Sequence, residues 1–319
     1  MIRLFEERDY EPIVALGARI DPDQPPSIEA NRHRDRTWDP RYSKLRLVVT
    51  RAEQVLGWGQ VAHMWWAFHP RHFVMRLQVD PTAQGRGLGS ALYERLLQQL
   101  DEWDAELVRT DTNAARQATL DWLLHRDFSE IQRRIELRLA VVDVELARFP
   151  DPDQLLSARG IRATTLAAER APGGERLLRE LYDLEILGGE DEPRPEQGIA
   201  MSYDRFLTQE LDEPSALPDG NFLAFEGERL IGMSRLQRDL ARPGSLQQGF
   251  TTVHPDYRGR GIALALKLLT VRYAQANGYR EIATGNDTTN APMLHINQVL
   301  GFRERSRHLV FERRFDRPS

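Results

Sequence analysis

The chain has 319 residues, of which 41% are hydrophobic and 29% charged, and its formal net charge at pH 7 is −5. This length suits two domains of ordinary size better than one, and the small negative charge gives no sign of a general nucleic-acid-binding surface. Because the chain contains no cysteine, disulfides, cysteine nucleophiles and thiolate metal sites are excluded.

Hydrophobic periodicity predicts an alternation of strands and helices along the first half of the chain. The expected strands cover residues 2–5, 45–51, 55–66, 73–79, 107–110 and 131–141. The helices expected between them cover residues 10–20, 27–36, 86–103 and 114–125. The helix at 86–103 has the clearest pattern, because leucines recur at every fourth position from Leu88 to Leu100.

The second half is expected to repeat this order of elements. Its strands are predicted at residues 161–165, 222–225, 230–236, 246–253, 281–284 and 308–315. Its helices are predicted at residues 175–187, 261–276 and 293–300. The connection between the halves is expected within residues 143–160, because the segment Pro150–Asp153 contains two prolines and should interrupt both helix and strand.

An internal repeat links the two halves. Residues 79–89, VDPTAQGRGLG, recur at residues 253–263 as VHPDYRGRGIA, an offset of 174 positions. The same offset carries Phe128 onto Phe302 without a gap. A chance recurrence of one glycine-rich turn would not hold its register so far along the chain. We therefore interpret the chain as a duplication.

The repeated turn has the composition of an anion-binding site. Glycines remove side chains, so that backbone N–H groups can converge on an anion. The helix that follows adds its unsatisfied N–H groups and the positive end of its dipole. Arg86, Arg258 and Arg260 add positive charge. The turn lacks the third glycine of a dinucleotide-binding fold and the Gly-Lys-Ser/Thr of a P-loop, so it predicts a different phosphate or pyrophosphate ligand.

The pattern Gln/Arg-x-x-Gly-x-Gly/Ala between a strand and a helix resembles the signature of the GNAT acyltransferase family, and it occurs at residues 84–89 and 258–263. The family's element order, β-α-α-β-β-β-α-β-α-β, is similar to that of both halves. The resemblance implies an α/β (α+β) chain of two tandem acyl-CoA N-acyltransferase domains, at 1–145 and 158–319, each a mixed, mostly antiparallel twisted sheet flanked by helices. This tandem architecture is similar to that of the mycothiol synthases within the family.

The resemblance also implies a ligand and a reaction. It implies acetyl-CoA as co-substrate, without a metal, and transfer of the acetyl group to a small-molecule amine. The pyrophosphate of the coenzyme is expected on each turn, and its pantetheine arm along the strand before the turn. The coenzyme-binding residues expected on this basis are Val79, Gln84, Gly85, Arg86, Gly87, Leu88, Gly89, Val253, Arg258, Gly259, Arg260, Gly261, Ile262, Ala263, Asn286 and Asn290.

Location and partners follow from composition. Residues 1–7 are too acidic and too poor in apolar residues for a signal peptide. No apolar run approaches the roughly 18 residues of a membrane-spanning helix. We expect a cytoplasmic monomer or homodimer that binds neither nucleic acid nor membrane.

The strand before each turn suggests that the two halves differ in function. Alternate residues of a strand share a face. In the first half the face of Val79 is apolar, with Phe73, Met75 and Leu77. In the second half the matching face of Val253 is polar, with Gln247, Gly249 and Thr251. We therefore expect the first half to be packed core and the second half to hold the catalytic cleft.

Two asparagines near the end of the second half leave two interpretations open. Asn286 and Asn290 follow the fifth predicted strand of that half. They could contact the pantetheine amides, or they could cap the helix that follows. The first half has Arg116 in place of Asn290.

The proton carriers of the reaction are not assigned by the resemblance. Many family members have a glutamate base six residues before the valine of this strand and a tyrosine acid five residues before the Gly-Phe phenylalanine, where this chain has Gln247 and Asn297. Gln247 therefore argues against the mycothiol synthase activity. The catalytic candidates are Asp191 and Glu192 of the acidic loop at 188–198, Asn297, an ordered water, and less directly His254 and His295.

Three functions remain open at this point. The first is an N-acetyltransferase that acts on a small amine. The second is a non-catalytic coenzyme A-binding or sensor protein, which the missing glutamate and tyrosine favour. The third is an enzyme with another acyl donor or an oxygen nucleophile. For the acidic loop, a solvated acidic turn is the alternative to a catalytic role.

Overall fold

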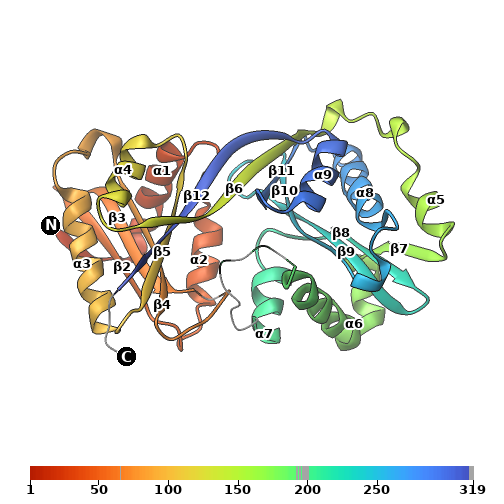
Figure 1. Ribbon diagram of the computed structural model, residues 1–319, viewed down its shortest axis with the longest axis horizontal. Helices are drawn as coiled ribbons and strands as arrows, with labels where there is room; N and C mark the ends of the chain where they lie inside the picture. The colour runs from red at the N-terminus through yellow and green to blue at the C-terminus, as the bar shows by residue number, and fades with distance from the viewer. Residues whose placement is uncertain (65, 192, 194, 196–200, 316–319) are drawn as a thin grey trace. The chain divides into compact units, whose positions relative to one another are not determined.

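The computed structural model describes residues 1–64, 66–191, 193, 195 and 201–315, and the chain forms two compact units (Figure 1). Unit 1 comprises Met1–Arg133, Pro195–Met201 and Ser306–Ser319, and unit 2 comprises Arg134–Arg194 and Ser202–Arg305. Among the described residues, no helix combines the length and the apolar character that crossing a membrane requires.

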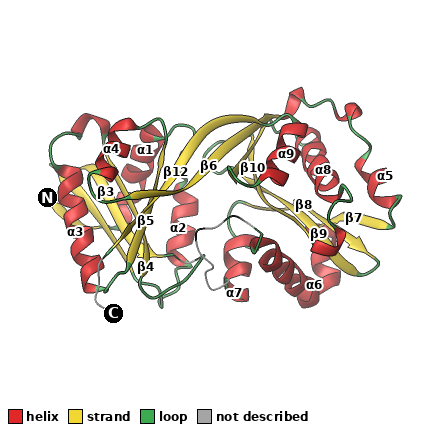
Figure 2. Ribbon diagram, in the orientation of Figure 1, coloured by secondary structure: helices red, strands yellow, loops and turns green. Residues whose placement is uncertain are grey.

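Unit 1 contains a mixed sheet with helices on both faces (Figure 2). Its strands, in their order across the sheet, are β1 (Ile2–Leu4), β2 (Lys44–Arg51), β3 (Gln54–His63), β4 (His72–Val79), β5 (Leu107–Asn113) and β12 (Arg303–Arg314). Neighbouring strands are antiparallel except β4 and β5. Its helices are α1 (Tyr10–Ile20), α2 (Ile28–Arg36), α3 (Leu88–Glu102) and α4 (Gln117–Leu124), with short 3-10 turns at Glu7–Asp9 and Pro81–Ala83.

The core of unit 1 follows the periodicity of its sequence. The leucines of α3 lie on one face of that helix and pack with Phe73 and Met75 of β4. On the opposite face of the sheet, Ile13 of α1 packs with Val48 and Val55. The two faces are thus filled by alternate residues of the same strands, as a sheet covered on both sides requires.

Unit 2 has the same architecture. Its strands, in their order across the sheet, are β6 (Ser129–Ala140), β11 (Glu281–Asp287), β10 (Ser245–Val253), β9 (Arg229–Arg238), β8 (Ala216–Glu226) and β7 (Ile161–Thr165). Only β10 and β11 are parallel neighbours. Its helices are α5 (Pro152–Ser157), α6 (Leu166–Gly189), α7 (Tyr203–Phe206), a π-helical turn at Leu207–Leu211, α8 (Ile262–Ala276) and α9 (Ala291–Leu300), with short 3-10 turns at Val141–Asp143, Leu146–Arg148 and Pro255–Tyr257.

Helices α6 and α8 cover opposite faces of the unit 2 sheet. Val253 of β10 belongs to the core cluster that contains Leu266 of α8. The next residue back, Thr252, lies against Gly188 of α6, where a Cβ added to the glycine would be 2.3 Å from the threonine hydroxyl. Consecutive residues of β10 therefore face different helices.

The last strand of each sequence half completes the sheet of the other half. β12, from the end of the chain, pairs with β5 from His308–Asn113 to Arg314–Leu107, and Phe311 lies in the unit 1 core. β6 pairs with β11, and Leu139 lies in the unit 2 core. The compact units therefore do not coincide with the domains 1–145 and 158–319. Those bounds stay a prediction, which describes the two repeats along the sequence.

One expectation about the connection was wrong. The prolines at 150–153 were expected to interrupt any helix, but Pro152 is the first residue of α5. Asp151 caps this helix by accepting a hydrogen bond from the Gln154 backbone N–H at 2.9 Å. Proline is tolerated there because a first-turn N–H has no partner within the helix in any case.

Candidate functional site

The two glycine-rich turns have nearly the same backbone. Gly85 and Gly259 have φ of 72° and 73°, and Gly87 and Gly261 have φ of 79° and 76°. This left-handed region is open to glycine and strained for other residues. The space around the turns is also empty: a Cβ at Gly85, Gly87 or Gly259 would meet no heavy atom within 4 Å. Gly87 and Gly261 cap α3 and α8, and the first N–H groups of a helix are a place where an anion can bind.

The side chain of the first residue of each turn makes a hydrogen bond to the strand before the turn. The Gln84 side-chain amide donates to the Val79 carbonyl at 3.0 Å, and the Arg258 Nε donates to the Val253 carbonyl at 3.0 Å. Glutamine and arginine both have a long side chain with an N–H donor. Each side chain can therefore reach the valine carbonyl on the other side of the short 3-10 turn. This shared contact explains in physical terms why either residue serves at that position.

Of the two acidic-loop candidates, Asp191 lies among the described residues. Asp191 makes an ion pair with Arg258 at 2.5 Å, so its carboxylate lies at the glycine-rich turn. Both side chains are exposed, and such a pair contributes little stability. Glu192 lies outside the described residues. His254 caps the short turn at Pro255–Tyr257, and His295 is exposed on α9.

Each sheet opens beside the strand that leads to its turn. β4 pairs with β5 only through His72–Val74, and β10 pairs with β11 only through Ser245–Gln247. Beyond these residues the neighbouring strands separate, and one edge of β4 and of β10 has no strand paired to it in the described chain. An extended ligand with amide groups can add to such an edge as a strand would.

A β-bulge distinguishes β10 from β4. The pairing of β10 with β9 shifts by one residue between Gln248 and Thr251. The pairing of β4 with β3 keeps one register throughout. Residues 249 and 250 of β10 therefore oppose the single residue Arg235 of β9, and one of the two is an extra residue without a ladder partner. The opening between β10 and β11 lies beside the same residues.

The bulge also corrects the expected alternation along β10. Gln248, and not Gln247, faces α8, because its side-chain oxygen accepts a hydrogen bond from Thr270 at 3.1 Å. Gln247 instead donates to Asp239 at 3.0 Å. A Cβ at Gly249 would lie 3.4 Å from Nε of Arg235, on the α6 face. The expectation that Gln247 and Gly249 share the face of Val253 was therefore wrong, because a bulge reverses the alternation.

The corresponding strand of unit 1 is filled with apolar side chains. Phe73 is fully buried and Met75 nearly so, and both belong to the core cluster that α3 covers. This agrees with the apolar face expected for β4. The asymmetry between the repeats thus lies in the strands and not in the turns.

A charged cluster lies on the α6 face at the bulge. Arg235 of β9 is buried and pairs with Glu185 of α6 at 2.9 Å and with Glu210 of the π-helical turn at 2.6 Å. Burial raises the pKa of the Glu210 carboxyl to about 7. A carboxyl that titrates near neutral pH can take a proton from an amine. Sequence reasoning missed this cluster, because its members are far apart along the chain.

A second polar group joins α8, α9 and β11. Lys267 donates to the Asn297 side-chain oxygen at 2.6 Å, and the Asn297 amide donates to the Asn286 side-chain oxygen at 2.7 Å. Asn290 caps α9 by accepting from the Met293 N–H at 3.3 Å, whereas Asn286 is not a cap. The sequence carried a signal for Lys267, a charged residue inside the apolar run IALALKLLTV.

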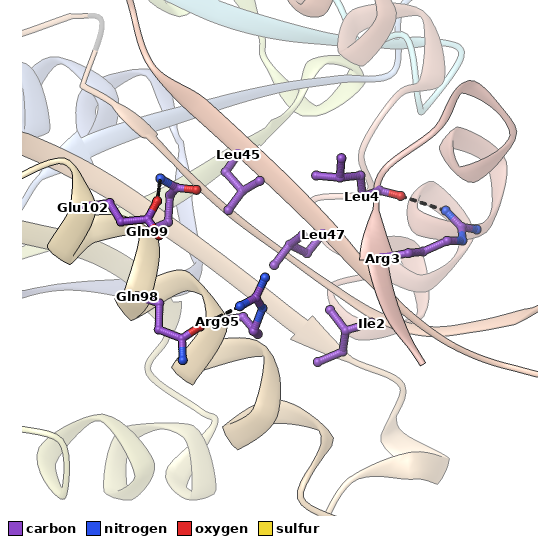
Figure 3. Close-up of a pocket in the computed structure, with 9 residues that line it drawn as sticks. All are labelled: Ile2, Arg3, Leu4, Leu45, Leu47, Arg95, Gln98, Gln99 and Glu102. Carbon is purple, nitrogen blue, oxygen red and sulfur yellow. Dashed lines mark hydrogen bonds between the residues drawn. The ribbon is translucent and has the colours of Figure 1, made fainter.

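A hollow in unit 1 lies away from the turn. It has a volume of about 370 Å³ and is bordered by β1, β2 and α3 (Figure 3). Its lining residues are Ile2, Arg3, Leu4, Leu45, Leu47, Arg95, Gln98, Gln99 and Glu102. None of them belongs to the glycine-rich turn.

One group of metal-ligand types occurs among the described residues, and it is also in unit 1. His69, His72 and Glu106 have ligand atoms within 4.8 Å of one another. His72 begins β4, at the end of that strand opposite the turn. The imidazoles of His69 and His72 lie with their centroids 3.8 Å apart. The expectation that the reaction needs no metal stays a prediction.

Comparison with known proteins relates this geometry to a family. The profile of the Acetyltransferase (GNAT) family matches residues 14–126 and 179–302. The mycothiol acetyltransferase of Amycolatopsis mediterranei (strain U-32) is 29% identical over 248 residues, which are 72% of each chain. That of Rhodococcus jostii (strain RHA1) is 26% identical over 262 residues, which are 80% of this chain and 78% of the relative.

Solved structures show the same fold over the full length. A tandem GNAT protein from the clavulanic acid biosynthesis pathway has a TM-score of 0.75 at 18% identity, with 100% of this chain and 99% of that chain covered. A GCN5-related N-acetyltransferase from Sphaerobacter thermophilus has a TM-score of 0.71 at 18% identity, with 98% and 95% covered. At this identity the likeness concerns the fold alone.

Proposed function

The chain belongs to the GNAT acetyltransferase family and has two GNAT regions in tandem, and from this premise we propose that it transfers an acetyl group from acetyl-CoA to a small-molecule amine at a site in unit 2. The observation that carries the location is the bulge in β10, beside the opening to β11 and directly before the turn at 258–263. The bulge, a free strand edge and the glycine-rich turn follow one another there. β4 has the turn and the opening, but no bulge.

The turn residues of unit 2 fit the pyrophosphate of acetyl-CoA. The space above Gly259 is empty, and only Leu155 comes within 4 Å of a Cβ at Gly261, at 3.5 Å. The first N–H groups of α8 and the side chain of Arg260 supply positive charge. The pantetheine arm is proposed to add to the free edge of β10 near Val253. The turn of unit 1 is proposed to bind coenzyme without turnover, or to serve as scaffold.

The reaction forms an N–C bond, breaks a C–S bond and needs two proton transfers. The amine must lose a proton before its nitrogen attacks the thioester carbonyl, and the carbonyl oxygen then becomes negative. We propose Glu210 as the base for this first proton and the backbone N–H groups at the bulge as donors to the oxyanion. When the C–S bond breaks, the thiolate takes up the second proton of the nitrogen. Asp191 is then a partner of Arg258 and not the base.

The acceptor is proposed to be a cationic primary amine. Three carboxylates, those of Glu185, Glu210 and Glu213, lie around the single cation Arg235 beside the bulge. This excess of negative charge favours an ammonium group. That the protein is cytoplasmic, and that it is a monomer or a homodimer, stays a prediction.

Thiol release tests the proposed function. Acetyl-CoA is incubated with the full chain and a panel of primary amines, and free thiol and acetylated amine are both measured. We expect thiol release that depends on one class of amine, with one acetylated product per thiol. Tight coenzyme binding by calorimetry without turnover of any amine would instead favour a non-catalytic coenzyme A-binding or sensor protein, the alternative that Gln247 and Asn297 support.

Replacing the proposed base should change the pH profile. In Glu210→Gln we expect kcat to fall about 100-fold, as for loss of a general base, with little change in the KM for acetyl-CoA. The carboxyl of the native chain accepts a proton only when ionised, so kcat should rise as the pH increases through about 7, the raised pKa of Glu210. That rise should be absent in the variant. The matched control is Glu175→Gln, an exposed carboxylate of α6; an unchanged profile in Glu210→Gln would exclude Glu210 as the base.

A further inference from the structure

Lys267 occupies an unusual environment for a charged side chain. It is one of two lysines in a chain with 43 lysines and arginines, and it is only 1% exposed on α8. The other, Lys44, makes an ion pair with Asp35. Lys267 has no carboxylate partner among the described residues: its contacts are the Asn297 oxygen at 2.6 Å, the Met293 sulfur at 3.9 Å and the ring face of Phe302.

The donors and acceptors of this group run in one direction. A lysine in its charged form can only donate, so the Asn297 amide must turn its oxygen towards Lys267. The nitrogen of Asn297 then donates to the Asn286 oxygen at 2.7 Å. Asn286 is left to present its own NH₂ group, which has no partner among the described residues. Lys267, at one end of this series of hydrogen bonds, therefore sets the orientation of both amides, and the other end is the NH₂ donor of Asn286.

Asn286, the last residue of this series of hydrogen bonds, lies at the opening between β10 and β11. β11 stops pairing with β10 at Ala283, and Asn286 follows three residues later on the separated part of the strand. α8 and α9, which carry Lys267 and Asn297, lie beside each other next to β10 and β11 (Figure 1). The three residues therefore come from three elements that border the opening.

The first repeat provides an internal comparison. At the same offset of 174 positions, Lys267, Asn297 and Asn286 correspond to Tyr93, Leu123 and Thr112. Leu123 is buried in an apolar core and cannot pass on a hydrogen bond. The polar chain therefore occurs in the repeat with the bulge and not in the repeat without it. A purely structural polar chain would have no reason to follow this division.

We propose that Lys267 is a positioning residue, which orients Asn297 and through it holds the Asn286 amide as a hydrogen-bond donor to the acetyl-pantetheine arm of acetyl-CoA. The inference rests on the proposed function, because it places that arm between β10 and β11. The low polarity around Lys267 adds a second property: burial lowers its pKa to about 7. Its neutral amine can still donate, so the direction of the chain is compatible with both forms.

Asn297→Asp tests the direction of the chain with the smallest change in shape. An aspartate accepts from Lys267 as asparagine does, but it cannot donate to Asn286, whose amide must turn and present its oxygen. We expect the Kd and the KM for acetyl-CoA to rise about tenfold, as for loss of a hydrogen bond with an acceptor left unpaired, with the KM for the amine unchanged. Lys267→Met should have the same effect by releasing Asn297.

A ligand without the arm separates positioning from general damage. The 3′-phospho-ADP fragment of coenzyme A carries the pyrophosphate for the turn but has no arm to enter the opening, so it should bind both variants within about twofold of the native chain. Lys44→Met is the matched control, with acetyl-CoA binding unchanged. Equal weakening of acetyl-CoA and 3′-phospho-ADP, or unchanged binding of both, would overturn the proposal. If the Gly261→Glu variant bound acetyl-CoA as tightly as the native chain does, the proposed site itself would be wrong.

Discussion

Gly261→Glu is expected to lower acetyl transfer, measured as kcat/KM for acetyl-CoA, by at least about 100-fold. Gly261 has φ of 76°, where a residue with a Cβ is strained. The new carboxylate would stand at the N-terminus of α8, where it repels the pyrophosphate and neutralises the positive end of the helix. Two lost charge-assisted contacts at such a site account for an effect of this size.

Gly87→Glu provides a control with the same backbone strain. Gly87 caps α3 with φ of 79°, and a Cβ there would meet no heavy atom within 4 Å. If unit 2 alone performs the chemistry, kcat should stay within a few-fold of the native value, while any coenzyme bound to unit 1 is lost. Calorimetric titration with acetyl-CoA gives the number of sites in each variant, and melting curves show that both remain folded. Equal loss of turnover in the two variants would contradict a single active unit.

Phe311→Ala is expected to destabilise unit 1 by about 3–5 kcal/mol, although Phe311 belongs to the second sequence repeat. Its side chain is 2% exposed and packs in the unit 1 core with Phe73 and Phe128. The neighbouring Glu312 also holds β12 to β5, since its carboxylate accepts two hydrogen bonds from the buried Arg109, at 2.9 and 2.8 Å. Hydrogen exchange followed peptide by peptide should show lost protection in β5 and α3.

Leu139→Ala is the reciprocal change. Leu139 belongs to the first repeat but packs in the unit 2 core with Leu246 and Ile282. It should reduce protection in β10 and β11, at a cost of about 2–5 kcal/mol. If each variant instead loosened the unit formed by its own sequence half, the exchange of β6 and β12 between the sheets would be wrong.

Much of the fold could be predicted because its signals are local. α1 and β7 have the predicted bounds, and α3 and α8 begin within two residues of the predicted start. These elements have strong apolar periodicity and clear ends. The turns were also predictable, since a positive φ and a close anion both require glycine. α7 and the π-helical turn at Leu207–Leu211 were not predicted, because their segment, although Tyr203, Phe206, Leu207 and Leu211 have helical spacing, is too short to show a clear periodicity.

Less of the site could be predicted. The apolar face of β4 followed from its residues, because an unbroken register preserves the alternation of side chains. The same reasoning failed for Gln247 and Gly249, since one extra residue in β10 turns the side chains before it to the other face. A bulge depends on the pairing with β9, which is not visible in β10 alone.

By itself, the sequence determined that the chain is a duplication, that each half forms a strand, a glycine-rich turn and a helix, and that the family is GNAT. These features depend on residues close together along the chain, where glycine, helix capping and periodicity act. Only the tertiary structure decided that β6 and β12 complete each other's sheets, that β10 has a bulge, and that Lys267, Asn297 and Asn286 form one chain of donors. These features depend on contacts between segments far apart in sequence, and the geometry of packing selects them.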